Sequence, residues 1–225
     1  MQASVLIYGT NMPIYGSYLT CLGENHKYMV NNHSIMAKNE TIAILQHLLE
    51  HKQEEYSIRE LAKIRNVNYK TAYQAIHKLH KQEAANIRKK GNTKLCSANN
   101  KLTLQTYQAE KHRLQEILQN SNLRVIYNEL RKINTQFIAL LFGSYVTKQA
   151  TKHSDIDLLI VTNNSQPIQE QLELLPLNIH LTPLTYEEYI QCIQQKTFNV
   201  ANEAHKHNIP LIGLEDYYRL QNNAL

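Results

Sequence analysis

Two short apolar runs in the second half of the chain, Phe137–Phe142 and Ile156–Val161, constrain its fold more than any other feature. Each run has the length of one strand in a small sheet and is too short for a buried helix. The first run is followed by Gly143-Ser144, and the second is preceded by Asp155 and interrupted by Asp157. Because strands disfavour aspartate, the two carboxylates indicate a role other than core packing.

The spacing of these residues, G-S-x10-D-x-D, points to phosphate and metal chemistry. Asp155 and Asp157 stand at positions i and i+2 of a strand, so both carboxylates project from the same face. Carboxylate oxygens are hard ligands of the kind that Mg²⁺ prefers. Gly143 lets the backbone approach a phosphate, and free N–H groups near Ser144 hold anionic oxygens where a strand enters a helix. Lys148 is a further candidate for phosphate contact, with a solvated side chain as the alternative.

This motif resembles that of the polymerase β-like nucleotidyltransferase superfamily, and specifically its minimal members. The resemblance implies Mg²⁺-dependent transfer of a nucleoside monophosphate from a nucleoside triphosphate, with ATP as the expected donor, to an acceptor hydroxyl. Asp155 and Asp157 would hold the metal, and Gly143, Ser144 and Lys148 would bind the nucleotide. Minimal members often modify a partner protein, as in toxin–antitoxin pairs, so a small helical partner is one expected acceptor.

The chain departs from the superfamily pattern at three positions. Thr147 and Lys148 stand where members often carry a basic residue and then glycine. The third aspartate of the family lies on the next strand, which here is Leu177–Leu181. Depending on the register, its place falls to His180 or to Asn178, and His180 is the candidate for a catalytic base. The alternative function is therefore a DNA-binding regulator whose nucleotidyltransferase-like domain senses nucleotide with weak catalysis.

The first half of the chain has a different pattern. Helical periodicity predicts helices over 40–51 and 69–82, and the capping box of Ser57 and Glu60 opens another between them. A hairpin is expected over 85–97. This order resembles that of winged helix-turn-helix DNA-binding domains, so the expected fold class is α+β, with this module fused to a small mixed-sheet nucleotidyltransferase domain.

Charge is concentrated in that first module. Residues 36–104 hold 13 Lys and Arg against 6 Asp and Glu, a net +7, whereas the whole chain carries +5. This balance predicts duplex DNA as a partner of residues 36–104. The third helix would read bases through one polar face and the hairpin would touch phosphates; an ordinary solvated face on a protein-binding module is the alternative. The candidate DNA-binding residues are Lys70, Gln74, His77, Lys81, Arg88, Lys89 and Lys90.

The remaining segments complete the domain organisation. A polar connecting helix is expected over 103–120, and the nucleotidyltransferase domain over 123–225, with the connection itself at 105–122. Within that domain the pattern predicts strands near 177–181 and 209–212 and a short connection over 167–172. The expected helices are 123–133, 146–151, 185–196, 200–207 and one starting at Glu215.

Residues 1–35 lack periodicity, and Met36 begins the helical pattern at once, so an over-extended start is one interpretation and an arm the other. A shortened chain that starts at Met36 is expected to fold with unchanged thermal stability. The three cysteines are widely spaced and the eleven histidines are scattered, so neither a disulfide framework nor a histidine metal site is expected. No apolar run approaches the ~20 residues of a membrane span, and the expected location is the cytoplasm. The oligomeric state is open, with a homodimer as one alternative.

Overall fold

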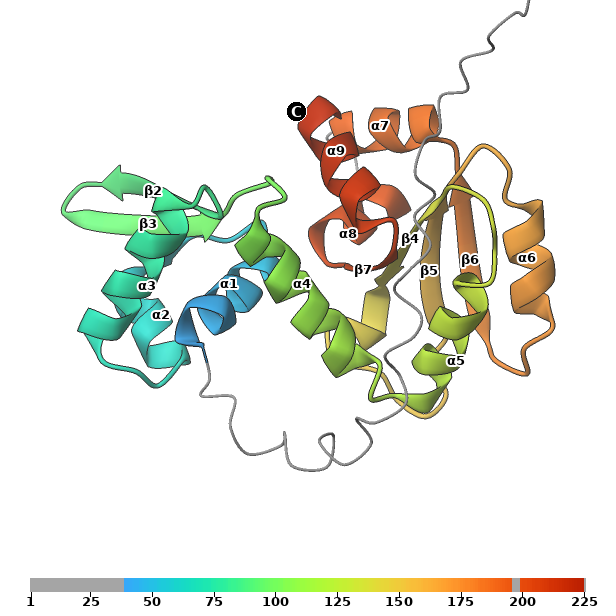
Figure 1. Cartoon of the computed structure of the whole chain (residues 1–225), viewed down its shortest axis with the longest axis horizontal. Coiled ribbons are helices and arrows are strands. Elements are labelled where there is room, and N and C mark those ends of the chain that lie inside the picture. The colour runs from blue at the N-terminus through green and yellow to red at the C-terminus, as the bar shows by residue number, and fades with distance from the viewer. Residues whose placement is uncertain (1–38, 196–198, 225) are drawn as a thin grey trace, which may run out of the picture. The chain divides into compact units, whose positions relative to one another are not determined.

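The computed structural model describes residues 39–195 and 199–224, which belong to one compact unit, residues 39–225 (Figure 1). The predicted arm over 1–35 and the alternative start at Met36 lie outside the described residues. The fold mixes helices with two small sheets, so the expected α+β class holds at this level. No helix among the described residues is long and apolar enough to cross a membrane.

The first half of the described chain contains the predicted helices and hairpin. Its elements are α1 (Glu40–Glu50), β1 (Tyr56–Ser57), α2 (Ile58–Ile64), α3 (Tyr69–Lys81), β2 (Ala85–Lys90) and β3 (Thr93–Ala98). The capping box of Ser57 and Glu60 is present at the start of α2. The strands form an antiparallel sheet in the order β1-β3-β2, and Gly91 makes the hairpin turn with a φ of +60°. Leu45, Leu61 and Leu79 are fully buried in one core.

The second sheet carries the predicted strands in the order β6-β5-β4-β7. These are β4 (Ile138–Phe142), β5 (Ile156–Val161), β6 (Ile179–Leu184) and β7 (Ile209–Ile212). The central strand β4 runs antiparallel to β5 and β7, whereas β5 and β6 are parallel. A parallel pair needs a crossover, and helix α6 (Gln166–Glu173) provides it. The expectation of a short connection over 167–172 was therefore wrong.

Helices cover both faces of this sheet (Figure 1). Alternate residues of β4 point to opposite faces: Ala139 and Leu141 pack with α5 (Ser121–Leu130) and α6, while Ile138 and Leu140 pack on the other side. That other layer consists of α7 (Tyr186–Gln194), α8 (Val200–Lys206) and α9 (Leu214–Ala224). A capping box of Thr185 and Glu188 opens α7. Both faces of β4 and β5 are thus buried, which explains their nearly continuous apolar sequence.

Helix α4 (Leu104–Ile117) was expected to be a polar connection, but part of its polar surface is buried. Glu110 and Arg113 have side chains only 2% and 1% exposed, and they form an ion pair 2.6 Å long. Arg113 also donates to the Asn208 carbonyl, and the Tyr218 hydroxyl donates to Glu110. Ala109 of the same helix packs in the core formed by α1–α3. Helix α4 is therefore a packed element with a buried polar network.

Candidate functional site

The antiparallel pairing of β4 and β5 brings Gly143 against Asp157. Phe142, the last residue of β4, lies opposite Asp157, so Gly143 follows directly beside that carboxylate. Gly143 has a φ of +72°, and a Cβ at this position would overlap Asp157 Oδ2. Only glycine meets both conditions. The sequence predicted that this glycine lets a phosphate approach the backbone. In the structure, the Asp157 side chain fills the space that a Cβ of Gly143 would take.

The chain around Ser144 forms a tight turn rather than a regular helix. Gly143–Tyr145 is a short 3₁₀ helix, and the Val146 and Thr147 N–H groups both donate to the Gly143 carbonyl at 3.1 Å. The Thr147 hydroxyl also donates to that carbonyl. Lys148 then takes a φ of +60°, which ends helical geometry. The helix expected over 146–151 was therefore wrong, because side-chain bonding and a left-handed residue compete with it.

The two carboxylates open β5 as the spacing predicted. Asp155 is exposed and directly precedes the strand, and Asp157 is its second residue, with a side chain 24% exposed. Ile156 between them is buried in the core on the opposite face. Both acidic groups therefore share one face at the start of β5.

The parallel strand β6 adds the two candidates for the missing carboxylate. The register places His180 opposite Asp157, and His180 Nδ1 lies 3.2 Å from Asp157 Oδ1. The Asn178 side-chain amide donates to Asp155 Oδ1. His180 on β6 and Asn178 just before this strand thus each contact one acidic residue at the start of β5. We call these four residues the Asp–His cluster. The register left open by the sequence pairs His180 with Asp157.

Lys148, the predicted phosphate contact, belongs to a different neighbourhood. Its side chain is 77% exposed, and its Nζ lies 3.8 Å from Glu50 Oε1 at the end of α1. Its backbone is left-handed, a conformation in which a Cβ is strained and which glycine adopts without that cost. A role of Lys148 in nucleotide binding stays a prediction.

Replacing Lys148 by glycine is expected to raise the free energy of unfolding by about 0.5–1 kcal/mol. The left-handed conformation costs a non-glycine residue roughly 1–2 kcal/mol, and the extra flexibility of glycine in the unfolded chain offsets part of the gain. Urea denaturation measures the difference. Lys148→Ala is the matched control, because it removes the exposed pair with Glu50 and keeps the strain, and it should stay near the wild type. Equal stability of the two variants would contradict this account.

The candidate DNA-binding residues differ in how they are engaged. Lys70, Gln74 and Lys81 are exposed on α3, as are Lys89 and Lys90 on the hairpin. Arg88 is held by an ion pair with Glu55, so it is not a free cation. His77 is half-buried, and burial together with Lys94, whose Nζ lies 3.3 Å from the ring, lowers its pKa.

Sequence reasoning missed the aromatic part of this surface. Tyr69 and Tyr73 are 51% and 38% exposed, and they stand at i and i+4 of α3 with ring centroids 6.0 Å apart. With Arg59 and Lys94 they line a cavity of about 500 Å³ between the start of α2, the start of α3 and the hairpin turn. Lys94 lies over the Tyr73 ring at 5.3 Å. The i, i+4 spacing of two tyrosines was the available signal.

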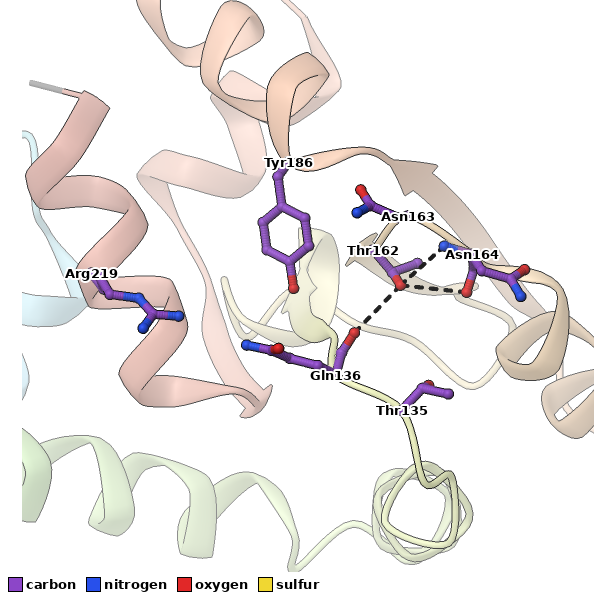
Figure 2. Close-up of a pocket in the computed structure, with 7 residues that line it drawn as sticks. All are labelled: Thr135, Gln136, Thr162, Asn163, Asn164, Tyr186 and Arg219. Carbon is purple, nitrogen blue, oxygen red and sulfur yellow. Dashed lines mark hydrogen bonds between the residues drawn. The ribbon is translucent and has the colours of Figure 1, made fainter.

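A separate cavity of about 390 Å³ lies at the other end of β5 (Figure 2). Its lining consists of Thr135, Gln136, Thr162, Asn163, Asn164, Tyr186 and Arg219. The Thr162 hydroxyl donates to the Gln136 and Asn164 carbonyls, and Arg219 is paired with Asp216. Because Thr162 follows the last residue of β5 and Asp157 is near its first, this cavity is not part of the Asp–His cluster. Neutral amides and hydroxyls dominate it.

The comparison with known families selects the same region as the motif. Residues 113–215 match the family model described as polymerase beta, nucleotidyltransferase. The matched segment contains Gly143, Ser144 and the whole Asp–His cluster. The match supports a nucleotidyltransferase-like activity for this part of the chain.

The other comparisons add little. No curated protein matches the chain. Among solved structures, the crystal structure of the adhesin competence repressor AdcR from Streptococcus pyogenes matches with 18% identity. The match covers 48% of this chain and 76% of that one, with a TM-score of 0.30. A likeness this weak carries no argument about the fold or the function.

Proposed function

We propose that the nucleotidyltransferase-like part transfers a nucleoside monophosphate from a nucleoside triphosphate to an acceptor hydroxyl, with Mg²⁺ as cofactor and ATP as the expected donor. The observation that carries this proposal is the Asp157 carboxylate seated against Gly143, with Asp155 on the same strand face. The turn that we propose to bind phosphate therefore lies beside one of the two carboxylates that we propose to bind the metal. These are the two elements that the chemistry needs within one site.

The donor set fits a hard divalent cation. Asp155 and Asp157 offer carboxylate oxygens on one face, and both lie at a strand end that is open to solvent. Oxygen ligands of this kind suit Mg²⁺, which keeps several of its waters and binds through one or two carboxylates plus phosphate oxygens. When bound, the ion would neutralise triphosphate charge and stabilise the leaving pyrophosphate. The turn at Gly143-Ser144 would orient the phosphates through its backbone N–H groups.

His180 is the residue available to accept the proton of the attacking hydroxyl. If its Nδ1 donates to Asp157 Oδ1, this hydrogen bond fixes the ring and leaves Nε2 as an acceptor. His180 is 64% exposed, so an acceptor can reach it. Imidazole is a poorer ligand than carboxylate for a hard cation, so a second ion would be weakly held and transfer slow.

Label transfer and pyrophosphate release separate two versions of the function, an enzyme and a nucleotide-sensing regulator. An enzyme would label a hydroxyl, for example on a small helical partner protein, and release pyrophosphate. A nucleotide-sensing DNA-binding regulator would bind the nucleotide with little release. Incubating the purified chain with labelled nucleoside triphosphates, Mg²⁺ and a lysate of its own cell distinguishes the two by label transfer.

Asp157→Asn is expected to weaken Mg-ATP binding by at least tenfold and to abolish transfer while the fold is kept. The change removes a metal ligand, and the asparagine retains the volume beside Gly143. Isothermal titration with Mg-ATP measures the affinity, and circular dichroism checks the fold. Glu173→Gln, which neutralises an exposed carboxylate on α6, is the control and should bind as the wild type does. Equal affinity of Asp157→Asn and the control would remove the Asp pair from the metal site.

We further propose that residues 39–104 form a winged helix-turn-helix domain that binds duplex DNA. The exposed polar face of α3, the lysines of the hairpin and the cavity between them support this proposal. Lys89 and Lys90 would contact phosphates, whereas Arg88 must first leave Glu55. In this arrangement α3 would supply the base contacts.

Lys89→Ala/Lys90→Ala is expected to weaken the binding of a duplex by the full chain and to reduce its salt dependence. Each phosphate contact contributes a slope of about −0.9 in log affinity against log salt, so losing two should flatten the slope by about 1.8. Fluorescence anisotropy at several salt concentrations gives both quantities. Lys111→Ala/Lys132→Ala, which removes two lysines outside this module, should leave the slope unchanged. Absence of wild-type binding at low salt would assign the module to protein contacts.

A further inference from the structure

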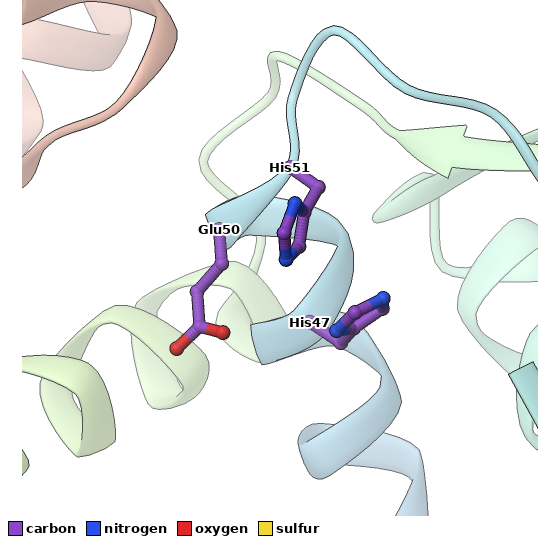
Figure 3. Close-up of side chains that lie close together, drawn as sticks. All are labelled: His47, Glu50 and His51. Carbon is purple, nitrogen blue, oxygen red and sulfur yellow. The ribbon is translucent and has the colours of Figure 1, made fainter. Parts of the chain in front are cut away.

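A second group of metal-binding side chains lies on α1, away from the Asp–His cluster. His47 and Glu50 lie at positions i and i+3 in the last turn of α1, and His51 is the C-cap residue that follows. Each residue offers one ligand atom, and these three atoms all lie within 4.8 Å of one another. Figure 3 shows the three side chains. Among the described residues, these three form the group with this property. The histidines that looked scattered in the sequence are therefore brought together by the helix.

One imidazole nitrogen of this group is buried without a partner. His47 Nε2 has no hydrogen-bond partner among the described residues. The ring is enclosed by His51 and Tyr56, with ring centroids 4.6 and 4.8 Å away. A buried polar atom left unpaired costs roughly 1–3 kcal/mol, and no hydrogen bond at this nitrogen holds the His47 ring in place.

The neighbouring contacts already orient the other two side chains. His51 Nδ1 lies 3.3 Å from Glu54 Oε1, and Glu54 in turn accepts from the Tyr56 hydroxyl. A metal-binding histidine commonly has its second nitrogen fixed by a carboxylate in this way, which directs its Nε2 to the ion. Glu50 faces Lys148 at 3.8 Å, a long and exposed pair that a stronger ligand displaces at little cost.

From this geometry we infer that His47, Glu50 and His51 form a binding site for a divalent transition-metal ion of the Zn²⁺ class. Two imidazoles and one carboxylate are the ligands that such ions prefer, in contrast to the all-oxygen set of the Asp pair. Zn–N distances of about 2.0–2.1 Å put tetrahedral ligand atoms about 3.3 Å apart. Small side-chain rotations reach this spacing, because the ligand atoms here all lie within 4.8 Å of one another. A fourth position stays open for water. Binding would take Glu50 from Lys148, and so couple this site to the loop after Gly143-Ser144.

The test uses Co²⁺ as a spectroscopic probe on the full chain. We expect one equivalent of Co²⁺ to give visible ligand-field absorption, and Zn²⁺ to displace it. His51→Ala and Glu50→Gln should each weaken that equivalent at least 100-fold, measured by competition with a chromophoric chelator. His112→Ala, a histidine removed from another helix, should bind as the wild type does. His47→Ala is a third variant, and circular dichroism identifies any variant that fails to fold.

Asp155→Asn/Asp157→Asn separates this inference from the proposed transferase site. The double variant should keep the Co²⁺ equivalent, since the α1 ligands are intact, even where it has lost Mg-ATP binding. Unchanged Co²⁺ affinity in both His51→Ala and Glu50→Gln would overturn the inference, as would the absence of binding at micromolar Co²⁺ in the wild type. Loss of the Co²⁺ equivalent in the Asp double variant would assign the metal to the Asp–His cluster instead.

Discussion

Replacing His180 by aspartate is expected to raise the rate of pyrophosphate release, by at most the roughly 10²–10⁴-fold that a positioned general base contributes, since His180 already supplies part of it. His180 lies opposite Asp157 in the parallel register, with Nδ1 3.2 Å from its Oδ1. A carboxylate there would complete a set of three oxygen donors around one strand end. The second ion that imidazole holds weakly would then be bound, and the proton of the acceptor hydroxyl would have an anionic base.

Two other variants define what this result means. Asn178→Asp should not produce the same gain, because Asn178 contacts Asp155 rather than Asp157, and a carboxylate there would repel its neighbour. His180→Ala should slow whatever transfer the wild type shows. Single-turnover measurements with labelled ATP separate the chemical step from binding. A fast wild type whose rate is unchanged in His180→Ala would show that another base acts, and the role given to β6 would then be wrong.

The position of the candidate site could be predicted from sequence because its residues are local to two strands. Gly143 and Asp157 lie where apolar runs end and begin, and an antiparallel pairing of those runs is enough to join them. The side chain facing Asp157 from β6 could not be predicted. His180 and Asn178 share one strand face, and choosing between them requires the register of a parallel pair linked through α6.

Local competition explains the elements that the sequence missed. Helix α6 begins at Gln166 with Pro167 in its first turn, after a polar segment, a pattern that fits either a loop or a helix start. The helix expected over 146–151 failed because Lys148 adopts a left-handed backbone, which no periodicity indicates. The H-x-x-E-H pattern of α1 was visible at helical spacing, but whether such histidines meet a partner depends on the packing of Tyr56.

The burial of α4 is a further feature that sequence could not supply, and it carries a large expected effect. Glu110→Leu is expected to lower the free energy of unfolding by about 3–5 kcal/mol, because it leaves the Arg113 guanidinium charged and unpaired in the interior. Arg113 would keep its bond to the Asn208 carbonyl but lose its counter-ion, and the Tyr218 hydroxyl would lose its acceptor. Urea denaturation at constant m-value measures the loss.

A double-mutant cycle distinguishes the cost of the orphaned charge from the cost of lost packing. Glu110→Leu/Arg113→Met removes both charges and should recover much of the stability lost in Glu110→Leu, since an apolar pair of similar volume often replaces a buried ion pair without loss. The exposed pair of Lys101 and Glu83 is the control, with side chains 54% and 66% exposed. Glu83→Gln should change stability by less than about 1 kcal/mol. If Glu110→Leu costs no more than that control, water reaches Arg113 and α4 is not the buried element that its 1% exposure indicates.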